Sequence, residues 1–218
     1  MTKINKINKN IEKVNQSNLQ SARGVLNTEI ENLQLLSKQL DDKNFNKNFN
    51  KNFLQILSIL ENCKGRVLVS GVGKSGLIAK KISAIFSSIS VASFFIHPTE
   101  AIHGDLGCIC KDDVLLAISC SGNTIELQDI VKYCNKNNIT TTSITCKKGS
   151  WLEKNSKINL SLNMKNEAIN GFPIPTTSSI LTLAICDALT ACLVKNKKLT
   201  YKRYIETHGG GEIGKSKK

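Results

Sequence analysis

Hydrophobic residues follow two different patterns along the chain, and the pattern changes near residue 65. Over residues 1–42 they recur at steps of three and four, which predicts an amphipathic helix. Residues 44–53 repeat the motif Asn-Phe-Asn-Lys, a polar connector whose phenylalanines would share one face if the segment is helical. Residues 53–60 predict a second helix, which ends before Gly65.

Beyond residue 65, short continuous apolar runs alternate with helical stretches. The runs cover residues 66–70, 91–96, 114–118, 139–145 and 158–162. The helical stretches cover residues 77–89, 125–137 and 177–194. Continuous apolar runs between helices are typical of parallel strands that are covered on both faces. The sequence therefore predicts an α/β fold, a three-layer αβα sandwich around a mainly parallel five-stranded sheet, with N-terminal helices in front of it.

Three parts of the chain follow from this pattern. They are an N-terminal helical segment with an Asn/Lys-rich connector (1–64), an α/β domain (65–214) and a basic tail (215–218). The net charge is +13, and lysine supplies 27 of the 30 basic residues. Proteins that grip a phosphate backbone usually rely on arginine, so we expect no nucleic-acid partner. A basic surface still favours small anionic ligands.

Membrane and secreted classes are excluded on similar grounds. No uninterrupted apolar run approaches the roughly 18–20 residues that a membrane span needs, and the N-terminus is polar. The eight cysteines are mostly single residues in apolar contexts, and the one close pair, Cys108 and Cys110, has no further ligands nearby for zinc. We therefore expect reduced thiols in a cytoplasmic protein that has neither a secretory leader nor a membrane partner.

Two glycine- and hydroxyl-rich loops each follow a predicted strand and precede a predicted helix. The first, residues 71–76, contains Lys74 but matches neither common nucleotide-binding spacing. The second, residues 119–124, carries three hydroxyls and a glycine. Ligands bind at the carboxyl ends of parallel strands, where glycines allow close approach and helix N-termini offer free N–H groups. These loops predict a phosphate site, and the alternative for each is a plain turn and helix cap.

Two further segments carry titratable groups. Residues 97–107 hold two histidines and two carboxylates, which suit metal binding or proton transfer, or else a capped turn. His208 precedes three glycines, which have no packing role. An imidazole on such a segment indicates an element that closes a site, and the alternative is a disordered tail.

Taken in order, these motifs resemble the sugar isomerase (SIS) domain of the arabinose 5-phosphate isomerases. The resemblance runs from about Gly65 to Gly214 and rests on six motifs: Gly-x-Gly-Lys-Ser-Gly, His-Pro-x-Glu-Ala-x-His-Gly-Asp-Leu-Gly, Ser-x-Ser-Gly, Lys-x-Glu-Ala, Pro-Thr-x-Ser and His-x-Gly-Gly. It implies the SIS fold and an aldose–ketose isomerase. Such an enzyme interconverts D-ribulose 5-phosphate and D-arabinose 5-phosphate through an enediol, and feeds the synthesis of 3-deoxy-D-manno-octulosonate (KDO) for lipopolysaccharide.

The resemblance also implies the site residues. The catalytic side chains are Lys74, Glu126, Glu167 and His208. Ser119, Ser121 and Thr124 hold the phosphate, and the other substrate-binding residues are Gly73, Ser75, His103, Gly122, Asn123, Thr177 and Ser178. No cofactor is required, and His97 matches a position that takes up an inhibitory zinc ion. The chain departs from the family at Cys120, Asn123 and Gly209, where Asn, an acidic residue and Pro are usual.

The resemblance also carries expectations about the oligomeric state and about regulatory domains. The resemblance implies a homotetramer with sites at its interfaces, and the apolar stripe of residues 1–42 has no obvious partner before residue 65. Because the sequence ends at Lys218, we expect the family's pair of cystathionine-synthase-type (CBS) regulatory domains to be absent.

One alternative function is that of a non-catalytic SIS domain that senses a sugar phosphate, although residues 1–60 show no helix-turn-helix. The other is an isomerase for a different sugar phosphate.

Overall fold

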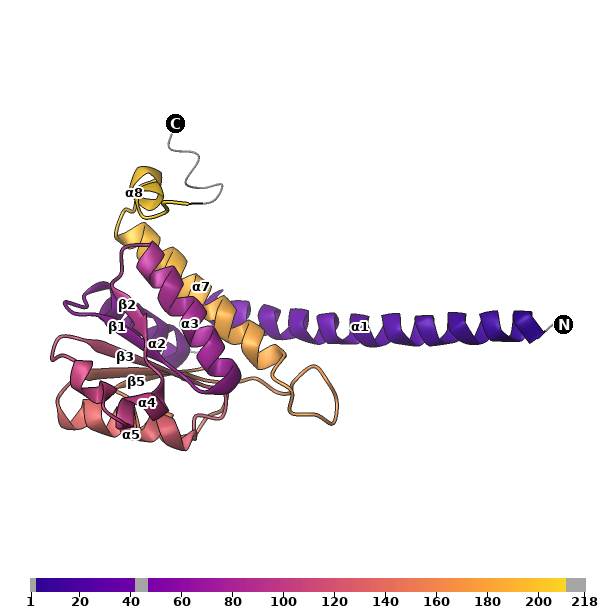
Figure 1. The fold of residues 1–218 in the computed structure, drawn as a ribbon, viewed down its shortest axis with the longest axis horizontal. Coiled ribbons are helices and arrows are strands. Elements are labelled where there is room, and N and C mark those ends of the chain that lie inside the picture. Colours follow the sequence, from indigo (N-terminus) through magenta and orange to yellow (C-terminus); the bar gives the residue numbers. More distant parts are fainter. Residues whose placement is uncertain (1–2, 42–46, 211–218) are drawn as a thin grey trace.

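The computed structural model describes residues 3–41 and 47–210 and contains one five-stranded sheet (Figure 1). Its strands are β1 (Val67–Ser70), β2 (Ser93–Phe95), β3 (Val114–Ser119), β4 (Thr140–Thr145) and β5 (Ile158–Ser161). They lie in the order β2-β1-β3-β4-β5, and every neighbouring pair is parallel. The predicted parallel α/β sheet is confirmed, strand by strand.

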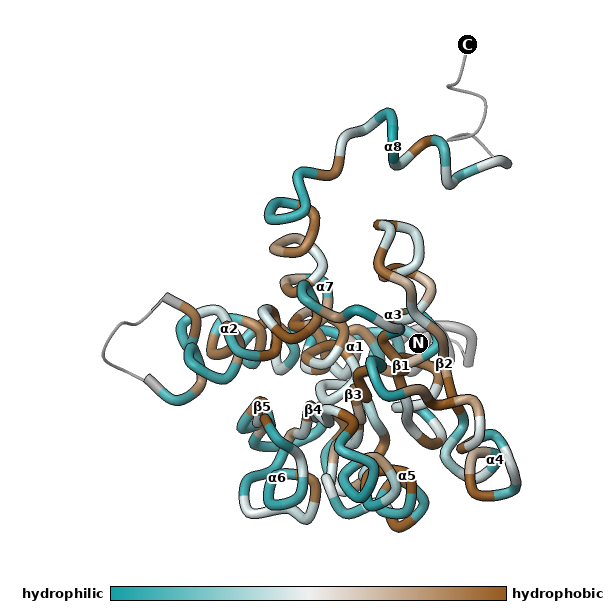
Figure 2. The backbone as a smooth tube through the Cα atoms, turned by 90° about the vertical axis from the view of Figure 1, so that its left-hand side faces the viewer, coloured by the Kyte–Doolittle hydropathy of each residue, from teal (hydrophilic) through white to brown (hydrophobic). Residues whose placement is uncertain are grey.

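Helices cover both faces of this sheet, and Figure 2 shows the two layers on either side of the strands. One face carries α1 (Lys3–Asp41), α2 (Lys47–Glu61), α3 (Gly73–Ser88) and α7 (Thr177–Asn196). The other carries α4 (Pro98–Ile102), α5 (Ile125–Lys136) and α6 (Trp151–Asn155). A short 3-10 turn (Asp105–Cys108) and α8 (Tyr201–Glu206) complete the described elements.

Alternation along β3 explains why the strands are continuous apolar runs. Leu116 and Ile118 point into the core beneath α3 and α7, whereas Leu115 and Ala117 point into the core beneath α5. All six residues of β3 are buried. A strand between two helical layers has no solvent face, so polar residues have no favourable position on it.

The Asn-Phe-Asn-Lys repeat is helical where it is described, because α2 begins at Lys47. Phe49 and Phe53 lie four residues apart and are 4% and 6% exposed, so they share the buried face. Residues 42–46 of the predicted connector and the basic tail 215–218 lie outside the described residues.

Helix α1 projects from the domain as a long rod (Figure 1). Its C-terminal part packs on the domain: Leu36 is buried in the core with α2 and α7, and residues 21–28 line a pocket with residues 168–170. Val14, Leu19 and Leu26 are 58–71% exposed. An apolar stripe of this length without cover inside the chain favours contact with another molecule.

Helix α7 bears on the expectation that the chain has no membrane span. By length and composition alone this 20-residue helix is apolar enough to cross a bilayer. However, Leu181, Ile185, Leu189 and Leu193 are 1% exposed or less in the core where α7 packs with α1, α2 and α3. The helix is apolar because it forms part of the core.

An ion pair joins the strands at their amino ends. The carboxylate of Asp113, just before β3, pairs with the guanidinium of Arg66 at 2.7 Å and accepts the backbone N–H groups of Arg66 and Cys110 at 2.7 and 2.8 Å. Burial raises the pKa of Asp113, but these hydrogen bonds outweigh it and hold the pKa below its ordinary value. The pair therefore fixes the start of β1 against the start of β3.

Candidate active site

The first loop connects β1 to α3 at the carboxyl edge of the sheet. Gly73 has a φ of +59°, a left-handed conformation that favours glycine. Gly76 packs so closely that an added Cβ would lie 2.6 Å from the carbonyl oxygen of Gly71. This turn leaves Lys74 exposed in the first turn of α3, beside the free N–H groups of that helix.

The second loop, residues 119–124, is locked by its own hydroxyls. The buried Ser119 hydroxyl lies 2.8 Å from that of Thr124 and accepts the N–H of Gly122 at 3.0 Å. Gly122 has a φ of +66°, and a Cβ there would collide with the side chain of Ser150. Ser119 therefore shapes the loop, while the Ser121 side chain stays exposed to a ligand.

Asn123, one of the departures from the family pattern, has a structural partner. Its side-chain oxygen accepts the N–H of Trp151 at 2.8 Å, and the carbonyl of Gly122 accepts the N–H of Leu152 at 2.9 Å. These bonds tie the second loop to the first turn of α6. The amide at position 123 thus serves the scaffold of the loop.

Glu167 lies across the N-terminus of α7. Its carboxylate accepts the backbone N–H groups of Thr176 at 2.9 Å and Ser178 at 3.1 Å, and the hydroxyls of the same two residues. Four donors fix the position of this carboxylate at the start of the helix. The neighbouring Thr177 is fully buried, and its hydroxyl has no hydrogen-bond partner among the described residues.

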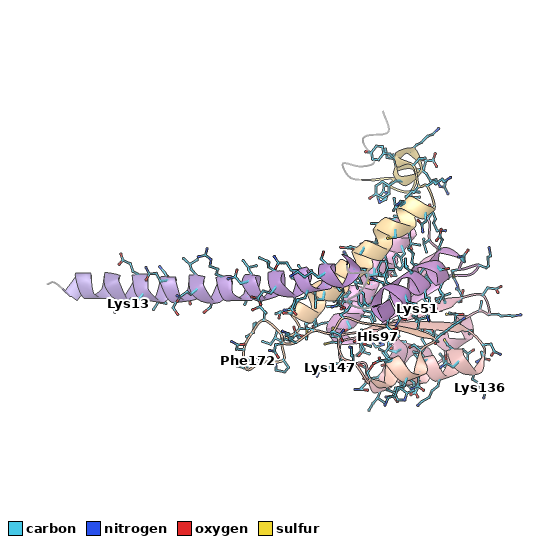
Figure 3. All side chains as sticks on the ribbon, turned by 180° about the vertical axis from the view of Figure 1, so that it is seen from behind. Lys13, Lys51, His97, Lys136, Lys147 and Phe172 are labelled. Carbon is cyan, nitrogen blue, oxygen red and sulfur yellow. The ribbon has the colours of Figure 1, made fainter. Side chains whose placement is uncertain are left out.

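One pocket of about 630 Å³ lies between the second loop, the loop after β4 and the segment before α7. Of the predicted site residues, it brings together Ser121, Glu167 and Ser178. Two of its other lining residues, Lys147 and Phe172, are labelled in Figure 3.

Two cations of this pocket, Lys147 and Lys165, were not predicted from the sequence. Lys147 lies two residues after β4, so the rule that pointed to the loops after the first and third strands would have found it. Lys165 lies in the Lys-x-Glu-Ala motif, whose glutamate alone was singled out. Together the two lysines make this pocket attractive to an anion.

Several predicted residues lie elsewhere along the chain. Among the described residues that line the pocket, Lys74, Glu126 and His103 are absent. His208 is at the other end of the sheet: the Thr207 hydroxyl donates to the carbonyl of Ser88, the last residue of α3. Figure 1 shows α8 at the end of α7 that is distant from the loops. The expectation that the four catalytic side chains converge is therefore not met within one chain.

His97 has a role in the local fold. Its Nδ1 accepts the N–H of Thr99 at 3.3 Å and caps α4, and its ring packs edge-on against Phe95. Over residues 3–41 and 47–210, no three His, Cys, Asp or Glu side chains gather as a metal site would require. The residues here do not fit a zinc ion on their own, so the zinc site stays a prediction.

Comparison with known proteins places these motifs in a family. The SIS domain family model matches residues 59–192. Arabinose 5-phosphate isomerase KpsF of Escherichia coli is 40% identical over 195 residues, which are 89% of this chain and 59% of KpsF. Arabinose 5-phosphate isomerase KdsD of Francisella tularensis is 38% identical over 201 residues, 91% of this chain and 59% of KdsD. The chain thus spans 59% of the length of these relatives.

A solved structure extends the comparison to three dimensions. The structure of E. coli CFT073 c3406 in complex with arabinose 5-phosphate superposes with a TM-score of 0.80 and 32% identity. The match covers 89% of this chain and 98% of that one.

Proposed function

Because this chain belongs to the SIS domain family, we propose that it is an aldose–ketose isomerase that interconverts D-ribulose 5-phosphate and D-arabinose 5-phosphate. The observation that carries the proposal is the pocket that joins Ser121, two lysines and the fixed carboxylate of Glu167. The likeness to c3406 with its bound arabinose 5-phosphate supports the ligand, and the activity in the names of KpsF and KdsD supports the reaction. The product feeds KDO synthesis for lipopolysaccharide.

The phosphate end of the sugar binds at the second loop. Ser121 is exposed there, and Thr124 precedes the first turn of α5, whose N–H groups are free to bind an anion. Lys147 and Lys165 add positive charge to the lining of the pocket. Phosphate binding remote from the reacting carbons orients them for the chemical step.

Isomerisation moves one proton between adjacent carbons, so it needs a base, an acid and a group that stabilises the enediolate oxygen. We assign proton transfer to Glu126 and His208, and charge stabilisation to Lys74. Glu167 already accepts four hydrogen bonds, so it orients α7 and the sugar hydroxyls. The proton transfer needs no redox cofactor.

The site is completed by a second subunit of a homotetramer. Helix α3 separates Lys74 from the end of the sheet where His208 lies, and 16 residues of helix span about 24 Å. One chain cannot bring both to the same carbon atoms. The exposed stripe of α1 supplies a surface on which such subunits assemble. All eight cysteines are free thiols, which supports a reducing, cytoplasmic setting.

The test is a turnover assay of the purified full chain with ribulose 5-phosphate in the presence of a chelator. We expect arabinose 5-phosphate to form. Calorimetric binding of arabinose 5-phosphate without turnover would instead support the sensing domain. Turnover of a different sugar phosphate alone would support the other isomerase. Either result contradicts the proposal.

A further inference from the structure

Two cysteines lie side by side where β3 and β4 end. Ile118 and Ile144 are register partners, and Cys120 and Cys146 follow two residues later on their strands. Because side chains alternate along a strand, each cysteine shares the face of its isoleucine, and all four pack in the same apolar core. The N–H of Cys146 donates to the carbonyl of Cys120 at 3.0 Å, which continues the ladder between the strands.

This placement satisfies the distance that a disulfide requires. Neighbouring strands lie about 4.8 Å apart, and disulfide-bonded Cα atoms are usually separated by about 4.4–6.8 Å. Their main-chain hydrogen bond keeps the two residues paired, and each thiol shifts the pKa of the other. A bond between them therefore needs side-chain rotation and no movement of a strand.

The two thiols differ in access and acidity. Cys120 is half-buried and lines the 630 Å³ pocket, whereas Cys146 is 1% exposed. The hydrogen bond to Cys146, with a further one to Ser178, outweighs burial and lowers the pKa of Cys120 to about 7. The hydrogen bond to Cys120 and burial raise the pKa of Cys146. Cys120 thus has the thiolate character and exposure of a reactive cysteine, and Cys146 is shielded behind it.

We propose that Cys120 and Cys146 form a reversible disulfide on exposure to hydrogen peroxide, and that this bond switches off the pocket. The Cys120 thiolate attacks one oxygen of the peroxide, the O–O bond breaks, and Cys120 becomes a sulfenic acid; the departing hydroxide takes up the proton that Cys120 released on ionising and leaves as water. Cys146 then attacks that sulfur, the S–S bond forms and the S–O bond breaks, and the departing hydroxide takes the Cys146 proton and leaves as a second water. The two thiols lose two electrons to the peroxide, and a dithiol reductant reverses the step.

The expected effect on activity follows from where Cys120 lies, and it rests on the proposed isomerase function. Cys120 stands between Ser119 and Ser121 and lines the same pocket as Ser178, which also holds Glu167. A bond to Cys146 draws the Cys120 sulfur away from this pocket. The loop hydroxyls and Glu167 then no longer keep their relative positions.

The experiment treats the full chain with hydrogen peroxide, blocks the remaining thiols by alkylation and maps cysteine pairs by mass spectrometry. We expect the Cys120 and Cys146 peptides to be joined, and dithiothreitol to release them. Turnover should fall about 10²-fold in parallel and return on reduction. Cys108→Ser, a change at an exposed cysteine outside this pocket, should behave like the unmodified chain.

Variants separate the two steps. In Cys146→Ala, dimedone should trap Cys120 as a sulfenic acid, because no resolving thiol remains. Peroxide that oxidises other cysteines and leaves Cys120 and Cys146 open to alkylation overturns the proposal, as does a disulfide between Cys108 and Cys110 alone. A mapped Cys120–Cys146 bond without loss of turnover overturns the switch. If the chain lacks isomerase activity altogether, the peptide mapping still shows whether Cys120 and Cys146 form a disulfide.

Discussion

Ser178 donates to Glu167 twice, once from its backbone N–H at 3.1 Å and once from its hydroxyl. The helix that begins at Thr177 thus both starts at the pocket and holds its carboxylate. This arrangement makes the position of Glu167 depend on the first turn of α7. Substitutions in that turn should change catalysis without changing the sheet.

Ser178→Ala should lower kcat about tenfold while the chain stays folded. A hydrogen bond to a charged group contributes about 1.5–3 kcal/mol, and Glu167 keeps its two backbone donors. Steady-state kinetics measures the effect, and circular dichroism checks the fold. Ser179→Ala is the matched control, because the Ser179 hydroxyl donates only to a carbonyl of the same turn. Equal kinetics in both variants would contradict the role of Ser178.

Mixed oligomers should regain activity that neither parent has. Lys74→Ala and His208→Ala should each lose about 10²–10⁴ in rate. If each site takes Lys74 from one subunit and His208 from another, co-expressed chains assemble some sites with both side chains intact. Turnover of the purified mixture, compared with both parents, is the measurement. A mixture no more active than its parents would show that subunits do not share the site.

Gly122→Ala should destabilise the fold more than Gly149→Ala. Both glycines have a positive φ, which costs an L-residue about 1–2 kcal/mol. A Cβ at Gly149 meets open space, whereas one at Gly122 collides with Ser150. Urea unfolding of the two variants gives the difference directly. Equal free energies of unfolding would mean that the loop relaxes freely and is not locked.

Asp113→Asn should cost about 2–3 kcal/mol of stability at neutral pH, because a buried charge pair with Arg66 is lost. The folded pKa of Asp113 is depressed, so its contribution is present above the unfolded pKa of about 4. It disappears as the pH falls through the folded pKa. Unfolding measured at several pH values should show that the difference in stability between the variant and the unmodified chain disappears in acid. Asp112→Asn, at an exposed neighbour, should show no such difference at any pH.

Leu19→Glu with Leu26→Glu should shift the chain to smaller assemblies. Both leucines are exposed on α1, and a charge on each would oppose burial against another subunit. Light scattering at micromolar concentration measures the mass. Gln20→Glu adds charge to the same helix on the face opposite the apolar stripe and should leave the mass unchanged. A chain that is monomeric before any substitution would rule out this interface.

The two shortest helices could not be predicted from the hydrophobic pattern. Helices α4 and α6 have only five residues each, too few for a 3.6-residue period to appear in the sequence. They are specified by caps: His97 accepts the N–H of Thr99, and Ser150 accepts that of Glu153. Such a cap does not predict a helix from the sequence, because residues that are close along the chain make the same contact in many turns.

The sequence alone determined the five strands, the long helices and the two loops at the carboxyl edge, because burial between two layers requires continuous apolar runs and turns require glycine. The tertiary structure alone decided which side chains meet. It placed Cys120 beside Cys146 through strand register and put Lys147 on the wall of the pocket. It also put His208 at the opposite end of the sheet from Lys74 of the same chain. Local patterns record how much of each residue is buried, whereas contacts between distant segments depend on how the layers pack.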